Sequence, residues 1–136
     1  HIFFSDRYYG YDDGIYVSLR LIELLSKIKR KLSDCVFDIP KYVSTPEIRI
    51  ECDDDDIKFD IVNKIIKYFS NKFNCSLIDG VRIEFDYGWG LIRASNTQPV
   101  IVCRFEATSE ERMQQIKKLI TDKLNEMGEL KFDVGH

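Results

Sequence analysis

The order of two hydrophobic patterns most constrains the fold of this chain. From residue 47 onward, segments of alternating apolar and polar residues are interrupted and then followed by segments with apolar residues three and four positions apart. Alternation is typical of strands with one buried face, and the longer spacing is typical of amphipathic helices. The order strand, helix, strands, helix predicts an α+β domain, with two helices on one face of a mainly antiparallel sheet.

The alternating segments 47–52, 81–85, 89–93 and 100–106 are predicted to form a four-stranded sheet, and residues 75–78 are predicted to be a short strand or the entry to one. The residues Asp86-Tyr87-Gly88 between the second and third segments are typical of a hairpin turn. The acidic run Asp53–Asp56 precedes the first predicted helix and lacks the ligand spacing and the glycine of a calcium loop. We therefore interpret that run as a helix cap and first turn.

The first part of the chain has a different pattern. A short apolar strand segment, Ile2–Phe4, is followed by a loop and by a helical pattern that runs to Leu32, with Asp12 and Asp13 as cap and first-turn charges. Because the chain begins at His1 and enters an apolar strand directly, we expect a fragment of a longer protein. The predicted division is a strand–helix remnant of an α/β domain at 1–36, a proline-containing linker or hinge at 37–46, a C-terminal domain at 47–131 and a tail at 132–136.

Charge, hydropathy and the positions of cysteine and histidine argue against nucleic-acid binding, a membrane span and a zinc site. The formal net charge of −3 provides no general attraction to nucleic acid or to an anionic membrane. No apolar stretch approaches the roughly 20 residues needed to span a bilayer. The four cysteines are irregularly spaced and both histidines lie at the chain ends, which argues against a zinc site. We expect reduced cysteines and a cytoplasmic protein.

One loop between two predicted strands concentrates hydrogen-bond donors. Ser95 and Thr97 offer hydroxyls, Asn96 offers an amide, and Arg93 can meet a phosphate with two parallel bonds. Arg104, on the following strand, joins this group if its side chain lies on the same face. Small residues also allow backbone N–H groups to surround an anion. The residue types favour oxyanion binding over bond cleavage, while a polar turn without a ligand stays open as an alternative.

The chain closely resembles the C-terminal domain of the α-D-phosphohexomutases from Asp79 through Pro99 to Arg104-Phe-Glu-Ala107. The usual loop of that family is Arg-Pro-Ser-Asn-Thr-Glu-Pro, and here Ala94 and Gln98 replace proline and glutamate. Residues 1–14 and 19–25 resemble the end of the family's third domain. Asn96 and the run Arg-Tyr-Tyr-Gly-Tyr-Asp-Asp are similar to the phosphomannomutase/phosphoglucomutase type.

The resemblance implies a C-terminal fragment, comprising the end of the third domain and a fourth domain similar in fold to the TATA-box-binding protein. It implies a parent enzyme that interconverts hexose 1-phosphate and 6-phosphate (mannose or glucose) through a phosphoserine and a bisphosphorylated intermediate. The residues implied to bind the non-reacting phosphate are Arg93, Ser95, Asn96, Thr97 and Arg104, and His1 is implied to bind sugar.

The family's Mg²⁺ would be bound outside this chain, which has no catalytic or metal-binding candidate of its own. The expected partners are a hexose phosphate and the remaining mutase domains, and we expect the fragment alone to be inactive. Two alternatives stay open: a fragment of a phosphoglucosamine mutase, and a non-catalytic α+β module that binds protein or nucleic acid. The acidic charge balance argues against nucleic acid.

Overall fold

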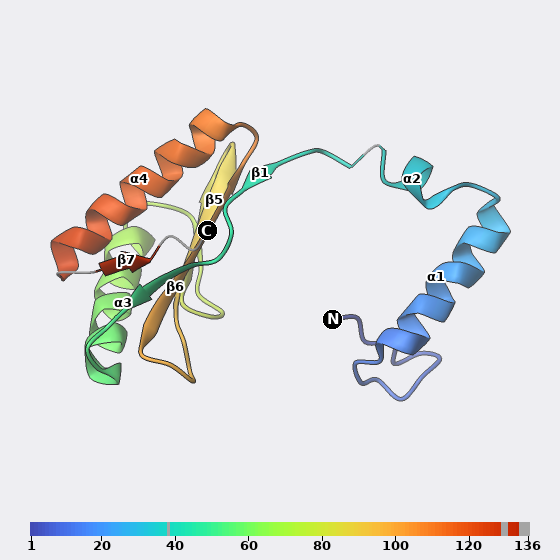
Figure 1. Cartoon of the computed structure of the whole chain (residues 1–136), viewed down its shortest axis with the longest axis horizontal. Helices are drawn as coiled ribbons and strands as arrows, with labels where there is room; N and C mark the ends of the chain where they lie inside the picture. Colours follow the sequence, from blue (N-terminus) through green and yellow to red (C-terminus); the bar gives the residue numbers. More distant parts are fainter. Residues whose placement is uncertain (38, 129–130, 134–136) are drawn as a thin grey trace. The chain divides into compact units, whose positions relative to one another are not determined.

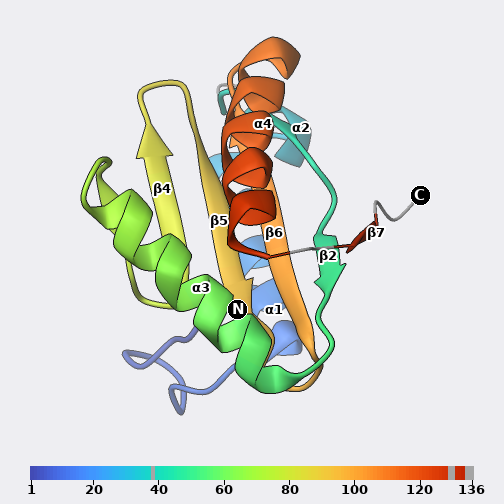
Figure 2. The same cartoon turned by 90° about the vertical axis from the view of Figure 1, so that its left-hand side faces the viewer.

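The computed structural model describes residues 1–37, 39–128 and 131–133, and it divides into two compact units, residues 1–40 and 41–136. The second unit contains an antiparallel sheet with the strand order β3-β4-β5-β6-β2-β7, and β1 pairs separately with β6. Figure 1 shows the elements in chain order, and the order of β4, β5, β6, β2 and β7 across the sheet can be followed in Figure 2. The strands are β1 (Val43–Ser44), β2 (Ile48–Glu51), β3 (Cys75–Ser76), β4 (Val81–Phe85), β5 (Gly88–Ala94), β6 (Val100–Ala107) and β7 (Lys131–Asp133).

Helices α3 (Asp55–Ser70) and α4 (Glu110–Met127) lie side by side on one face of this sheet (Figure 2). The carboxylate of Asp54 caps α3 by accepting a hydrogen bond from the backbone N–H of Ile57 at 2.8 Å. The interpretation of the acidic run as a cap and first turn is therefore confirmed, and so is the α+β fold with both helices on one face.

The hydrophobic core lies between the helices and the sheet. Alternate residues of β6, from Ile101 to Ala107, are buried on the helix side. Gly90 of β5 marks the closest approach, because a Cβ atom there would lie 2.3 Å from the Cδ1 atom of Ile120 on α4. A glycine at this position lets the helix pack directly on the sheet.

The pairing of β5 with β6 determines which side chains share the opposite sheet face, here called the polar face. The register runs from Gly88 opposite Ala107 to Ala94 opposite Ile101, and it places Arg93 opposite Val102. Side chains alternate between the two faces of a strand, so Arg93 and Val102 point away from the helices.

The sheet is larger than the sequence analysis predicted. The four main predicted strands correspond to β2, β4, β5 and β6, and β3 confirms the short strand predicted at 75–78. Two further short strands, β1 and β7, extend the sheet. Strand β1 falls within the predicted linker 37–46, and β7 takes residues 131–133 from the end of the predicted domain and its tail. Strand β1 pairs with the end of β6 that β2 does not reach, at Glu106 and Ala107. Strand β7 pairs with β2 at the sheet edge, where free N–H and C=O groups accept a neighbouring segment. The tail residues 134–136 lie outside the described residues.

The first unit consists of a loop and two helices, α1 (Gly14–Ile28) and α2 (Leu32–Cys35). The predicted strand at Ile2–Phe4 is reduced to a single bridge between Phe3 and Asp12. The helical pattern does not run unbroken to Leu32, because Lys29 adopts a left-handed conformation with φ of 51° that ends α1.

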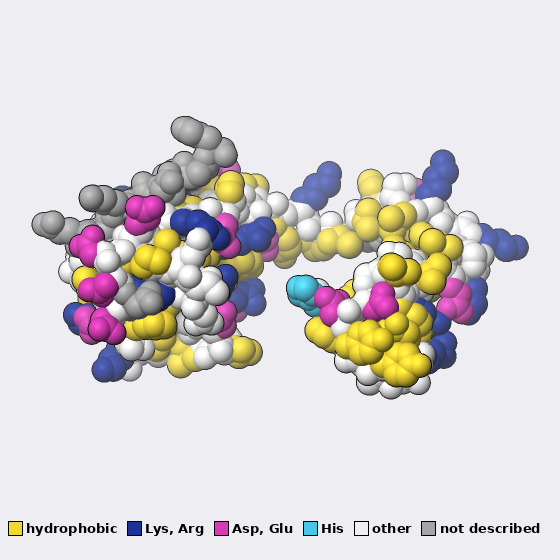
Figure 3. All heavy atoms as spheres, turned by 60° about the horizontal axis from the view of Figure 1, so that its bottom comes forward, with side chains coloured by type: hydrophobic (Ala, Val, Ile, Leu, Met, Phe, Trp, Pro, Cys, Tyr) yellow, Lys and Arg dark blue, Asp and Glu magenta, His cyan; other side chains and the backbone are white. Residues whose placement is uncertain are grey.

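Helix α1 buries none of its residues, and hydrophobic side chains gather on the surface of this unit (Figure 3). The most exposed include Tyr9, Ile15 and Ile22. Among the described residues, no helix combines the length and the hydropathy required to cross a bilayer.

The core can be tested with two neighbouring residues of α4. Ile120 is fully buried and Leu119 is 40% exposed. We expect Ile120→Ala to lower the free energy of unfolding by about 2–5 kcal/mol, because it leaves a cavity under β5. We expect Leu119→Ala, as the matched control, to cost less than about 1 kcal/mol. Urea unfolding measures both, and equal losses would contradict the assignment of the core face.

Cysteine reactivity gives a second test. All four cysteines are free, and complete burial raises the pKa of the Cys103 thiol to about 12. Because the thiolate is the reactive form, we expect iodoacetamide at pH 8 to leave Cys103 unmodified in the folded protein and to modify it in urea. Cys35 is partly exposed and serves as the internal control. Mass spectrometry of tryptic peptides would report both, and native labelling of Cys103 would contradict its burial.

Candidate functional site

The loop from Ser95 to Pro99 connects β5 and β6 at one end of the sheet. The backbone N–H of Ser95 donates to the carbonyl oxygen of Val100 at 3.0 Å, which closes the base of the loop. Within the loop, the N–H of Thr97 donates to the hydroxyl oxygen of Ser95 at 3.3 Å. Ser95 is only 8% exposed, whereas Asn96 and Thr97 are exposed. The loop is therefore anchored at its base and presents its tip to solvent.

The tip of the loop has hydrogen-bond donors without acceptors. Within residues 39–128, the backbone N–H groups of Asn96 and Gln98 and the side-chain amide of Asn96 donate to no protein acceptor. The hydroxyl groups of Ser95 and Thr97 lie 3.5 Å apart beside them. Exposed backbone and side-chain donors grouped in this way suit an anion with several acceptor oxygens.

Arg93 is the cation closest in sequence to this tip. It lies two residues before Ser95 on β5, and its Nη1 atom is 3.8 Å from the Oδ2 atom of Asp79. Gly80 brings Asp79 to this position: its φ is +70°, and a Cβ atom there would lie 2.7 Å from the Cα atom of Arg93. A side chain at residue 80 would push the turn away from β5, so glycine is required for this ion pair.

Arg104 lies on the same polar face as Arg93. The register pairs Arg93 with Val102, and Arg104 is two residues further along β6 and is exposed. The two arginines are therefore diagonal cross-strand neighbours, a spacing that long side chains can bridge. The structure thus groups Arg93, Ser95, Asn96 and Thr97 at one end of the hairpin. Arg104 lies on the same polar face but further from the loop, opposite Leu91.

Two cationic side chains contact the loop and were not identified from the sequence. Lys58 of α3 is 1% exposed, and its Nζ atom donates to the carbonyl oxygen of Gln98 at 2.7 Å. Arg49 of β2 donates from Nη1 to the Oε1 atom of Gln98 at 2.8 Å. The sequence does indicate that Lys58 is buried, because it lies three and four residues before Ile61 and Val62, on the apolar face of the helix.

His1 lies in the first unit, where its Nδ1 atom contacts the carboxylate of Asp12. The neighbouring Asp13 caps α1 by accepting from the N–H groups of Ile15 and Tyr16, as the sequence predicted. Asp13 also accepts a hydrogen bond from the hydroxyl of Tyr8 at 2.6 Å, which raises the pKa of Tyr8 and lowers the pKa of Asp13. These contacts order the loop that follows His1.

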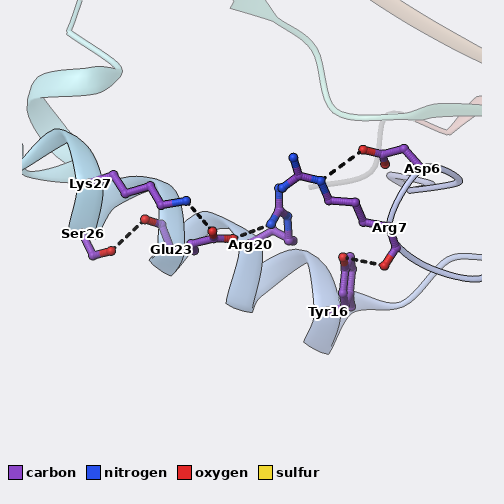
Figure 4. Close-up of polar contacts among 7 residues, drawn as sticks. All are labelled: Asp6, Arg7, Tyr16, Arg20, Glu23, Ser26 and Lys27. Carbon is purple, nitrogen blue, oxygen red and sulfur yellow. Dashed lines mark hydrogen bonds and ion pairs between the residues drawn. The ribbon is translucent and has the colours of Figure 1, made fainter.

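Charged side chains form a second network along α1 (Figure 4). Lys27 donates to Glu23 at 2.5 Å, and Arg20 pairs with the other carboxylate oxygen of Glu23. The hydrogen bond from Lys27, together with the charges of Arg20 and Lys27, lowers the pKa of Glu23. Arg7 pairs with Asp6 at 3.6 Å and accepts a hydrogen bond from Tyr16 at its carbonyl oxygen. On α1, Glu23 thus pairs with Arg20 three residues before it and with Lys27 four residues after it, spacings that place side chains next to each other on a helix.

A metal site is not evident in the described part of the chain. No group of three or more histidine, cysteine, aspartate or glutamate side chains there is arranged to hold an ion. At the candidate site, cationic side chains outnumber the carboxylates that pair with them, which suits an anion.

Known proteins resemble this chain in sequence over most of its length. A family profile described as "Phosphoglucomutase/phosphomannomutase, C-terminal domain" matches residues 47–123. The chain is 44% identical over 125 residues to a phosphomannomutase/phosphoglucomutase of Pseudomonas putida and 42% identical over 125 residues to one of Pseudomonas aeruginosa. Each alignment covers 91% of this chain and 27% of the relative, so the chain spans about a quarter of the length of these relatives.

The fold is similar to that of a solved relative. The crystal structure of a phosphoglucomutase/phosphomannomutase family protein from Burkholderia thailandensis superposes with a TM-score of 0.79 at 36% sequence identity. The superposition covers 93% of this chain and 26% of that protein. The profile match, the sequence identities and the shared fold lead to one conclusion: this chain belongs to the phosphoglucomutase/phosphomannomutase family, and residues 47–123 match the family's C-terminal domain.

Proposed function

We propose that this chain is the C-terminal part of a cytoplasmic phosphohexomutase and that the loop Ser95–Pro99 binds the substrate phosphate that is not reacting. The observation that supports this most is the exposed loop tip, where the N–H groups of Asn96 and Gln98 have no acceptor among residues 39–128. The hydroxyls of Ser95 and Thr97 and the guanidinium of Arg93 complete a set of donors for a phosphate dianion.

The chemistry of these groups fits the proposed reaction, the interconversion of hexose 1-phosphate and 6-phosphate for mannose or glucose. A bisphosphorylated intermediate must present first one end and then the other to a phosphoserine. Donors that recognise only the phosphate are indifferent to which sugar oxygen carries it. They would hold the intermediate in either orientation while the reaction takes place at its other end.

The ion pair between Arg93 and Asp79 suits a site that must bind and release. At 3.8 Å and with both side chains partly exposed, this pair is weak. A phosphate dianion, which can accept two parallel bonds from the guanidinium, would compete effectively with the single carboxylate. In the unliganded chain Asp79 would keep Arg93 beside the loop.

The remaining parts of the proposed enzyme belong to other segments of a longer protein. These are the phosphoserine and the ligands of Mg²⁺, a cation that would offset phosphate charge during transfer. The residues proposed to bind phosphate, from Arg93 to Thr97 together with Arg104, include no carboxylate and do not fit a Mg²⁺ site. Arg104 would add charge to the phosphate site, and His1 would contact the sugar as part of the first unit.

Phosphate binding can be measured by amide NMR on the 136-residue chain titrated with glucose 1-phosphate. We expect the amides of Asn96 and Gln98 to shift, and Arg93→Gln to weaken binding by about tenfold or more, because a charge-assisted bidentate contact is lost. The matched control is Arg82→Gln, which removes the same charge from the polar face where Arg82 pairs with Glu84 at 3.3 Å. Equal dissociation constants for the two variants, or no amide shift at saturation, would contradict the proposal.

Catalysis by the isolated chain is a separate question. We expect no conversion of glucose 1-phosphate to glucose 6-phosphate by the purified 136-residue chain with Mg²⁺ and glucose 1,6-bisphosphate, because the proposed site holds phosphate but contains no nucleophile paired with a base. A coupled dehydrogenase assay measures the product. Turnover that rises with protein concentration and disappears on heating would contradict this expectation.

A further inference from the structure

Two arginines lie on opposite sides of one buried valine on the polar face. Val102 of β6 pairs with Arg93 on one neighbouring strand and with Arg49 on the other. Directly opposed residues are about 5 Å apart, so the two arginines begin about 10 Å from each other. Val102 is only 4% exposed although α3 and α4 cover the other face. Both arginines can therefore extend over Val102 toward one ligand.

The guanidinium of Arg49 is directed to the phosphate loop. Its Nη1 atom donates to the side-chain oxygen of Gln98 at 2.8 Å, and its Nε atom donates to the carboxylate of Glu47 at 2.9 Å. Gln98 follows Thr97 directly, so this contact brings a second positive charge to the tip of the loop. The pairing with Glu47 uses Nε, and the contact with Gln98 uses Nη1, which leaves Nη2 for a further acceptor.

Gln98 is a well-fixed partner for Arg49. Its carbonyl oxygen accepts from the buried ammonium of Lys58 at 2.7 Å and from the N–H of Val100 at 2.8 Å. With its backbone held from α3 and β6, the Gln98 side chain can orient Arg49 from a defined position. Arg49 already pairs with the carboxylate of Glu47. A neutral amide at residue 98 orients the guanidinium without adding a second carboxylate beside it.

We propose that Arg49 is a further phosphate-binding residue, which contacts the same phosphate as Arg93 from the opposite side of Val102. This inference rests on the proposed function of the loop. Gln98 acts as a positioning residue: it holds Arg49 at the loop, where Glu47 is the carboxylate paired with Arg49 and Nη2 remains for the phosphate. The affinity of the site then comes from two arginines on two different strands, in addition to the loop donors.

The test uses the 136-residue chain titrated with inorganic phosphate at pH 7.5 and followed by amide and arginine Nε–H NMR. We expect Arg49→Gln to weaken binding about tenfold, because a charge-assisted contact is lost. Gln98→Ala keeps the charge and should weaken binding only about two- to threefold. Gln98→Glu should weaken binding about as much as Arg49→Gln, since a second carboxylate beside Arg49, in addition to Glu47, would neutralise the guanidinium and repel the phosphate. The charge-matched control is Arg82→Gln, and unchanged amide spectra elsewhere show that each variant is folded.

The outcomes separate this inference from the proposed function. The role of Arg49 is supported if phosphate shifts its Nε–H signal and if Arg49→Gln and Gln98→Glu lose more phosphate affinity than Gln98→Ala. If the unsubstituted chain binds phosphate at the loop but Arg49→Gln matches Arg82→Gln, the role of Arg49 is overturned and the loop site stands. Equal losses for Arg49→Gln and Gln98→Ala would also overturn it, because Arg49 would then only hold the loop. If the unsubstituted chain does not bind phosphate, both proposals fail.

Discussion

The antiparallel pairing of β5 with β6 is the constraint on which the second unit depends. These strands pair along their whole length, from Gly88 opposite Ala107 to Ala94 opposite Ile101. One register assigns every residue to a face, because a shift by one position would move each side chain to the other side. The same pairing therefore buries Ile101 under the helices and directs Arg93 to the polar face.

Because both helices pack on one face of the sheet, that face is apolar and buried, and the other face carries charged side chains. On one face, α3 and α4 bury apolar side chains and supply most of the stabilising hydrophobic contacts. On the other face, arginines from β2, β5 and β6 remain near the surface, where they can meet an anion without a large desolvation cost. Lys58 connects the two faces, since it is buried under α3 and donates to the loop that ends the hairpin.

Much of the second unit could be predicted from local patterns. The hairpin turn Asp86-Tyr87-Gly88, the cap at Asp54 and the donors of the loop are short-range features, and each depends on residues a few positions apart. The short strands β1 and β7 were not predicted. Two or three residues have no detectable periodicity, and these strands exist because a longer strand offers them an edge.

By itself, the sequence determined the class of the fold, the main strands and helices, and the composition of the loop from Arg93 to Pro99. Periodicity, caps and turns depend on residues close together in the sequence, so the sequence alone predicts them. Only the tertiary structure decided which charges meet that loop. Lys58 and Arg49 are 40 and 49 residues from Gln98, and helix packing and strand pairing alone bring them into contact with it.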